Sequence, residues 1–279
     1  MLRRSRVQRL VAFAIRPLLL AVCVSLFCRG RRIFSSSTPN NPHPHIEKAL
    51  VIASTSSSNL TWLPAAHSAY WTPRVYVTDD PAAEYRVPVN KGNEAMAYLT
   101  FIIDHYAHLP DVMFFHHDHL QAWHQLFSSE FELAHLNPET VREQGYVSPR
   151  CLPGCENIIE LSGDVVPLAD LKGANRDVQI STVLHEFLRD DQGRKMDVPG
   201  KIAAPCCAQF AVSREAVLRR PLETWVALRK WLMETELDSR SSGRVLEYTW
   251  HLWLGMEPVF CPKEEQCLCD VYGLGNACV

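Results

Sequence analysis

The sequence predicts one layered α/β domain with a mainly parallel central sheet, preceded by an N-terminal membrane anchor and a stem. Short apolar runs alternate with helical patterns, which is the element order of a layered α/β fold. One long apolar segment lies near the start, and an arginine-rich, acid-free region surrounds it. The predicted divisions are a cytoplasmic tail (1–9), a signal anchor (10–28), a stem (29–46) and a luminal domain (47–279) with a Cys-rich C-terminal loop.

The composition excludes several classes of protein. With 47% apolar and 21% charged residues in 279, the chain is neither disordered, collagen-like nor a coiled coil. Eight of the 28 basic residues lie within residues 1–46, so the rest carries 20 basic against 31 acidic residues. A duplex nucleic-acid partner is therefore not expected, because that interaction needs a basic face.

The N-terminal segment has three interpretations. Leu10–Cys28 is mostly apolar, but Arg16 and Pro17 interrupt it. The interpretation we favour is an uncleaved signal anchor, because no small-x-small cleavage site follows. The excess of arginine before the apolar core then predicts a single-pass type II membrane protein of the Golgi or ER lumen. A cleaved signal peptide with secretion, and a mitochondrial presequence, remain as alternatives. The Ser-, Pro- and Asn-rich residues 35–45 predict an extended linker.

Two features favour a luminal domain. Asn59-Leu60-Thr61 is an N-glycosylation sequon, with Asn59 as acceptor. An even number of cysteines beyond the apolar segment suggests disulfides in an oxidising compartment, although a zinc site is the alternative. The eight cysteines, whose pairing stays open, are Cys151, Cys155, Cys206, Cys207, Cys261, Cys267, Cys269 and Cys278.

The central sheet is predicted from three apolar runs: Ala49–Ser54, Arg74–Thr78 and Asp111–Phe115. Helical spacing predicts the intervening and following helices. Their ranges are Asn93–His108, Leu120–Leu136, Val178–Leu188, Arg214–Leu237 with a break at Pro221, and Gly243–Gly255. In such sheets ligands bind beyond the carboxyl ends of the strands, which directs attention to the residues after the second and third strands.

The third strand runs directly into a stretch of imidazoles and one carboxylate. These are the ligand types of Zn²⁺ and Mn²⁺, so we predict a divalent cation held by His116, Asp118 and His119. In an extended segment His117 and His119 project to one side, and His116 and Asp118 to the other, so at most one pair could chelate unless the chain turns. The alternative is a structural strand end whose histidines form hydrogen bonds.

Substrate contacts are predicted at two places. Lys91, Asn93 and Glu94 lie where a Gly-containing loop enters the first helix, and a helix N-terminus can bind an anion. A helix-stabilising role of Glu94 in the first turn is the alternative. Trp123 beside His124 suits the face of a sugar or a stacked base, and the alternative, which the residues alone favour, is a tryptophan that packs against a helix.

Glu247 and His251 are predicted as catalytic residues. They stand four residues apart on the last predicted helix, where a carboxylate and an imidazole can act as a base and its orienting partner. A helix-stabilising pair is the alternative. Serine-hydrolase, dinucleotide-binding, P-loop and zincin motifs do not occur in the sequence.

The chain carries a set of motifs spread over most of its length. They are Trp62-Leu63-Pro64, Asn90-x-Gly92-x-Glu94, Phe115-His116-x-Asp118-His119, Trp123-His124, Cys206-Cys207-Ala208-Gln209-Phe210 and Glu247-Tyr248-x-Trp250-His251. As a set they resemble the fungal family named domain of unknown function 3431. The resemblance covers about residues 48–273 and supplies a grouping rather than a reaction.

In layout the chain is also similar to type II Golgi glycosyltransferases of the GT-A type, in which an acidic metal motif ends a central strand. The resemblance implies a nucleotide-sugar donor, a glycan or protein acceptor and Mn²⁺ on the diphosphate. No D-x-D triplet follows an apolar strand here, so either a His-Asp-His set replaces it or the protein is metal-independent. A non-catalytic luminal carbohydrate-binding protein and a metal-dependent hydrolase using residues 116–119 are the alternative functions.

Overall fold

The computed structural model describes residues 45–155, 158–276 and 278. Ile46–Val279 is assigned to one compact unit. The predicted tail and anchor, and nearly all of the predicted stem, lie outside the described residues. Within the described part, no helix combines the length and apolar character that a membrane span requires.

A five-stranded mixed sheet forms the centre of the domain, with strand order β2-β1-β3-β7-β4. β1 pairs in parallel with β2 and with β3, whereas β7 is antiparallel to both β3 and β4. A separate two-stranded sheet pairs β5 with β6. The strand bounds are β1 Lys48–Ser54, β2 Thr72–Val77, β3 Val112–His116, β4 Tyr146–Val147, β5 Ile159–Glu160, β6 Lys201–Ile202 and β7 Phe210–Ser213.

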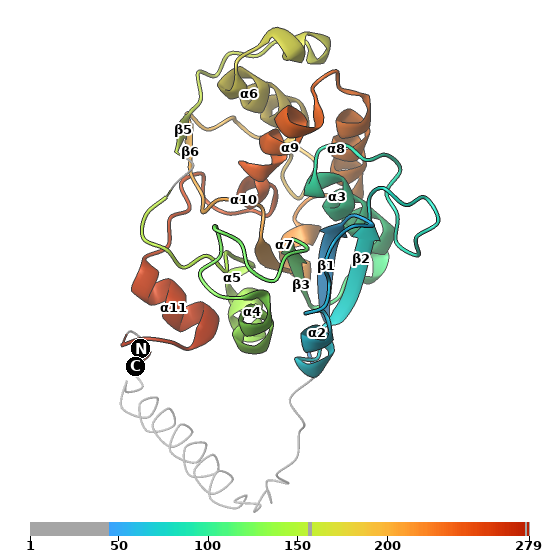
Figure 1. Cartoon of the computed structure of the whole chain (residues 1–279). Coiled ribbons are helices and arrows are strands. Elements are labelled where there is room, and N and C mark those ends of the chain that lie inside the picture. The colour runs from blue at the N-terminus through green and yellow to red at the C-terminus, as the bar shows by residue number, and fades with distance from the viewer. Residues whose placement is uncertain (1–44, 156–157, 277, 279) are drawn as a thin grey trace, which may run out of the picture. The chain divides into compact units, whose positions relative to one another are not determined.

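Helices cover both faces of the sheet (Figure 1). Their bounds are α2 Pro64–Ser68, α3 Glu94–His105, α4 Ser129–His135, α5 Pro138–Gln144, α6 Arg176–Phe187, α7 Arg214–Leu218, α8 Leu222–Glu234, α9 Ser239–Glu247, α10 Trp250–Trp253 and α11 Glu264–Tyr272. Two short 3₁₀ segments, Tyr106–His108 and Leu168–Gly173, complete the elements of the described residues.

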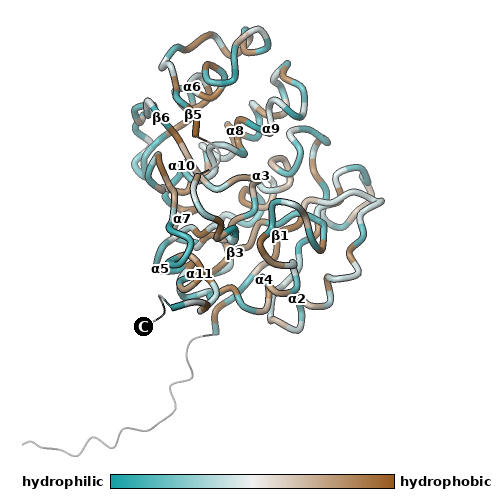
Figure 2. Tube along the Cα trace, turned by 60° about the vertical axis from the view of Figure 1, so that its left-hand side comes forward, coloured by the Kyte–Doolittle hydropathy of each residue, from teal (hydrophilic) through white to brown (hydrophobic). Residues whose placement is uncertain are grey.

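Two hydrophobic clusters lie on opposite faces of the sheet, because side chains alternate along each strand. On one face Met113 and Phe115 pack with α3, α8 and α10; on the other, Val112 and Phe114 pack with α2, α4 and α11. β3 is buried along its whole length, as expected for the middle strand. Figure 2 shows hydrophobic stretches at β3 in the interior of the domain. Burial on both faces fixes the carboxyl end of β3 in position.

The sequence predicted the first three strands correctly within two residues, and the helix predicted over Asn93–His108 is α3 followed by the 3₁₀ segment Tyr106–His108. The mainly parallel sheet is confirmed only for β1, β2 and β3, since β7 and β4 run antiparallel. The break at Pro221 is confirmed, because α7 and α8 flank it. The helix predicted over Leu120–Leu136 is wrong before α4, where Ser128 accepts a hydrogen bond from the amide of Phe131 and caps the helix.

The predicted disulfides are confirmed, and the structure gives their pairing: Cys151–Cys267, Cys155–Cys261, Cys206–Cys207 and Cys269–Cys278. The predicted Cys-rich C-terminal loop is in part a helix, since Cys267 and Cys269 lie on α11. Two disulfides join the C-terminal region to residues 151 and 155, more than 100 residues earlier in the chain.

Removing the buried Cys151–Cys267 disulfide by a double Cys→Ala substitution is expected to destabilise the domain by about 2–5 kcal/mol, because the bond closes a loop of more than 100 residues. Urea unfolding followed by tryptophan fluorescence measures this. The matched control replaces Cys269 and Cys278, whose loop spans only nine residues and should cost less. Equal losses in both variants would contradict the loop-length argument.

Candidate metal centre and the adjacent pocket

A polar pocket of about 330 Å³ lies at the carboxyl ends of the parallel strands. Loops that follow β1, β2 and β3 contribute to it, as does the start of α3. Its lining residues are Ala53, Ser54, Thr55, Thr78, Asn90, Asn93, Glu94, His117, Asp118 and His119. A larger depression of about 510 Å³ lies beside Glu186 and Pro221. We favour the smaller pocket because it adjoins a cluster of imidazoles.

Three imidazoles meet beside this pocket: His117, His119 and His124. β3 ends at His116, and the chain then turns, so that His124 returns to face the strand end. The candidate ligand atoms of the three rings all lie within 4.8 Å of one another. His119 Nε2 and His124 Nε2 are 3.3 Å apart. Two nitrogen ligands of a tetrahedral zinc ion with bonds of about 2.0–2.1 Å stand about 3.3 Å apart, so this pair already has ligand spacing.

Asp118 orients His119 rather than joining the cluster. Its Oδ1 lies 3.2 Å from His119 Nδ1, and its Oδ2 accepts a hydrogen bond from the hydroxyl of Ser58. The hydrogen bond from His119 lowers the pKa of Asp118 to about 2. Partial burial acts in the opposite direction, and the hydrogen bond from Ser58 adds to the lowering. With Nδ1 of His119 donating to this carboxylate, the Nε2 lone pair of the neutral ring faces the cluster, as in carboxylate–histidine–metal arrangements.

Two imidazoles of the cluster, His117 and His124, favour the neutral form, which is the form that binds metals. Burial, followed by the neighbouring histidines, lowers the pKa of His117 well below its usual value. Burial, then His119 and Arg150, lowers the pKa of His124 to about 4. His117 Nε2 is buried, and no described residue forms a hydrogen bond with it, which is costly unless a ligand or ion supplies the missing partner. These observations fit a divalent cation.

The structure places His116 outside the cluster. It is completely buried on the opposite face, and both ring nitrogens are engaged, with the carbonyl of His117 at 2.6 Å and with Glu132 Oε2 at 3.2 Å. No lone pair of His116 therefore points at the other imidazoles. Our predicted metal set shared only His119 with the cluster, and His124, predicted as a substrate contact, belongs to it.

Two glutamates form a second feature of the site. Glu94 lines the pocket, and burial, reinforced by the charge of Glu247, raises its pKa to about 8. Burial likewise raises the pKa of Glu247, opposed by Arg244 and by the backbone N–H of Cys207. Both groups hold their protons more tightly than ordinary carboxyls, which suits proton transfer near neutral pH.

Close packing of two glycines brings the glutamates together. Gly92 has φ +72°, and a Cβ there would lie 2.6 Å from the side chain of Leu232. A Cβ on Gly243 would lie 2.8 Å from the carbonyl oxygen of Gly92. α9 therefore approaches the loop before α3 at backbone distance, and Glu247 follows Gly243 by one helical turn.

Tyr98 was not predicted as a site residue. It lies one turn after Glu94 on α3, and its buried hydroxyl has no hydrogen-bond partner in the part of the chain that the structure describes. Burial raises its pKa well above the usual value, and the charges of Glu94 and Asp118 add to the shift. Its hydroxyl therefore belongs to the same electrostatic environment. A tyrosine amid helix-spaced apolar residues carries no sequence signal of this role.

The other predicted residues are positioned as follows. The ammonium of Lys91 donates to the carbonyl of Thr235, at the end of α8. His251 is buried, and its Nε2 bonds the carbonyl of Pro258 at 3.1 Å, so it does not orient Glu247.

Three other predicted residues lie at the surface. Trp123 is 82% exposed beside His124. Asn93 is exposed at the N-cap of α3 without capping it, and Asn59 is exposed, as a glycan acceptor must be.

Glu94 should make stability depend on pH. The unfolded chain loses this proton near the ordinary glutamate pKa of about 4.3, but the folded protein keeps it until about pH 8. Stability is therefore expected to fall as pH rises between these values. Glu94→Gln should flatten this dependence and stabilise the protein at pH 8 by an amount on the order of 2 kcal/mol. Urea unfolding at pH 5 and pH 8 measures it; an unchanged slope in the variant would contradict the assignment.

Fold and site together define an α/β protein with a candidate three-histidine metal centre at the carboxyl edge of its sheet. The chain belongs to the family described as "Protein of unknown function (DUF3431)", whose model matches residues 50–270. No curated protein and no solved structure matches the chain significantly.

Proposed function

We propose that this protein is a divalent-metal-dependent enzyme of the secretory pathway that transfers a sugar from a nucleotide-diphosphate donor to a glycan or protein acceptor. The observation that carries the proposal is the cluster of His117, His119 and His124 after the middle strand of the sheet, beside a polar pocket. Ligands of α/β sheets bind at this edge. Imidazole nitrogens suit Zn²⁺ and also bind Mn²⁺.

The charge of the pocket is consistent with an anionic donor that binds together with a metal ion. Among the described residues its lining includes the carboxylate of Asp118, whose pKa is low, but neither lysine nor arginine. A diphosphate would be repelled there unless a cation offset its charge. A divalent ion held by the three imidazoles would supply that positive charge. The hydroxyl and amide groups of Ser54, Thr78 and Asn90 can hydrogen-bond the hydroxyls of a nucleoside or sugar.

Glu247 is the residue we assign as the base for the acceptor hydroxyl. Its carboxylate is close enough to Glu94 for its charge to raise the pKa of that residue, and Glu94 lines the pocket. A base with a raised pKa removes a proton more effectively near neutral pH. Glu94, which itself keeps a proton to about pH 8, can hydrogen-bond a ligand oxygen from the pocket wall.

The arrangement around β3 adds a supporting analogy. The segment Ala208–Ser213, similar to the acceptor side of some GT-A enzymes, includes β7, which pairs with β3 and leads into α7. Four disulfides are consistent with the oxidising lumen of the Golgi or ER. With a type II anchor over 10–28, this domain would be luminal. Analogy at the level of fold is an association and does not by itself identify the reaction.

Titrating purified full-length protein with nucleoside diphosphates and nucleotide-sugars, with Mn²⁺, with Zn²⁺ and with chelator, tests this function. We expect binding and slow donor hydrolysis that require the metal and disappear in a His119→Ala variant. Alanine at His67, an exposed imidazole on α2, is the matched control and should leave both unchanged. Absence of metal-dependent binding for every nucleotide tested would contradict the proposal.

A metal-dependent hydrolase is the second candidate, and the all-imidazole ligand set favours it. Three histidines with an open position are a ligand set of catalytic zinc, which lowers the pKa of its bound water. Stoichiometric zinc, together with hydrolysis of ester or amide substrates and no nucleotide binding, would select this function. Glycan binding that persists in chelator without turnover would instead indicate a carbohydrate-binding protein, with the exposed Trp123 as its contact.

A further inference from the structure

The three histidines of the candidate centre share a feature of their backbone. The backbone carbonyl of each accepts a hydrogen bond from the side chain of another residue. His116 Nδ1 donates to the carbonyl of His117 at 2.6 Å, Ser129 Oγ to that of His119 at 2.7 Å, and Arg150 Nη1 to that of His124 at 2.5 Å. The three donor residues are all buried.

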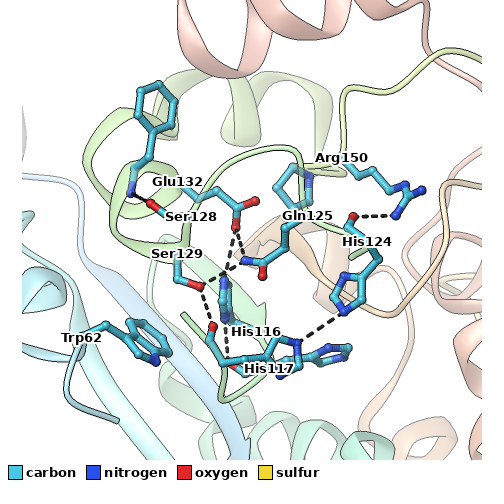
Figure 3. A network of polar contacts seen from close by, with 12 residues as sticks. Trp62, His116, His117, His124, Gln125, Ser128, Ser129, Glu132 and Arg150 are labelled. Carbon is cyan, nitrogen blue, oxygen red and sulfur yellow. Dashed lines mark hydrogen bonds and ion pairs between the residues drawn. The ribbon is translucent and has the colours of Figure 1, made fainter. Parts of the chain in front are cut away.

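Two of these donors are connected through buried polar side chains, as Figure 3 shows. Glu132 Oε2 contacts His116 Nε2 at 3.2 Å and accepts from Gln125 Nε2 at 3.5 Å. The same Gln125 nitrogen donates to Ser129 Oγ at 3.1 Å. The hydroxyl of Ser129 thus accepts a hydrogen bond from Gln125 and donates one to the backbone carbonyl of His119. We call His116, Gln125, Ser129 and Glu132 the supporting network.

The loop after β3 depends on these contacts because regular structure does not hold it. No backbone amide in the described part of the chain donates to the carbonyls of His117, His119 or His124. The carbonyl of Asp118 between them is held in the same way, by the indole N–H of Trp62 at 3.1 Å. A buried carbonyl without a partner costs free energy, so each of these donors restricts the backbone that carries a ligand.

We propose that the supporting network positions the histidine ligands before metal binds and thereby sets the affinity of the centre. The inference rests on the proposed function only in requiring that His117, His119 and His124 bind a divalent cation. α4 contributes Ser129 and Glu132, so this helix connects the opposite face of the sheet to the metal edge. A loop held in the ligand geometry loses less conformational entropy on binding, which strengthens affinity.

The chain offers a matched pair of serines for the test. Ser129→Ala removes the hydroxyl that holds the carbonyl of His119. Ser128→Ala removes the neighbouring hydroxyl, which caps α4 through the amide of Phe131 and, among the described residues, forms no hydrogen bond with the supporting network. We expect Ser129→Ala to weaken Zn²⁺ and Co²⁺ binding roughly 10–100-fold, the usual loss when a partner of a metal ligand is removed. Ser128→Ala should lower thermal stability but leave both affinities unchanged.

Gln125→Met, which keeps the volume but removes the amide, is the second variant, in case Ser129→Ala folds poorly. It should also weaken binding, and the double variant should lose less than the product of the two single effects, because both act on one network. The affinities are measured by competition with a chromogenic chelator, and the Co²⁺ absorption spectrum reports ligand geometry. Full-length protein is used throughout.

The outcomes separate the two proposals. Wild-type protein that binds neither Zn²⁺, Co²⁺ nor Mn²⁺ overturns both the metal centre and the supporting network. Wild-type protein that binds metal, with Ser129→Ala and Gln125→Met indistinguishable from Ser128→Ala in affinity, overturns the network and leaves the metal centre standing. Weaker binding in the two network variants, with the control unchanged, supports the inference.

Discussion

Alanine in place of His124 is expected to reduce bound metal from about one equivalent per chain to a small fraction of that. Its Nε2 lies 3.3 Å from that of His119, so its removal leaves two imidazoles for the cation. The loss in affinity should exceed the roughly 10–100-fold that follows removal of a residue supporting a ligand. Elemental analysis of purified full-length protein, after equilibration with Zn²⁺ or Mn²⁺ and gel filtration, measures the occupancy.

The control for this result is His67→Ala, which removes an exposed imidazole from α2 and should keep full occupancy. Thermal unfolding of each variant in chelator separates loss of the metal from loss of the fold, because bound metal stabilises only the folded chain. If His124→Ala and His119→Ala both retained wild-type affinity, the cluster would not be the binding site.

The part of the fold that the sequence predicted is the part governed by local patterns. β1 and β3 are apolar runs bounded by polar residues, and α3 has apolar side chains at spacings of three and four. The direction of β7 has no such signal. It follows from pairing with β3 over a sequence separation of about 100 residues, and antiparallel pairing then makes the sheet mixed.

Only part of the metal cluster could be predicted from the sequence. Alternation along an extended segment places His117 and His119 on one side and His116 on the other, and this division agrees with the structure. The predicted set nevertheless included His116, which adjoins the other imidazoles in sequence but lies on the other side of the strand end. His124 joins through a turn that replaces the predicted helix, so its position depends on tertiary contacts of the loop.

The buried surroundings of the site could not be predicted from patterns. Glu132 and Ser129 resemble ordinary polar residues of an amphipathic helix, yet both are buried beneath the strand end. Glu94 and Glu247 are more than 150 residues apart, and only the close packing of Gly92 against Gly243 brings them together. Such pairs depend on tertiary structure, and they leave no local pattern by which a single sequence would reveal them.

Glu247→Gln is the substitution expected to have the largest effect on turnover. The amide keeps the shape of the side chain but cannot accept a proton, so the catalysed rate should fall about 10²–10⁴-fold. Binding of metal and donor should be nearly unchanged, because the cation is assigned to the three histidines. Initial rates with saturating donor, and a separate titration of donor affinity, distinguish these two effects.

The pH profile adds a readout that a structural role would not affect. Burial raises the pKa of Glu247, so its deprotonated, active form should increase as pH rises through that raised pKa, and the rate should increase with it. Glu247→Gln should abolish that limb, whereas Glu234→Gln, which removes an exposed carboxylate paired with Lys230, should preserve both rate and profile. A Glu247→Gln enzyme with wild-type turnover would show that another group removes the proton. Glu94, whose carboxyl group lines the pocket, would then be the next residue to substitute.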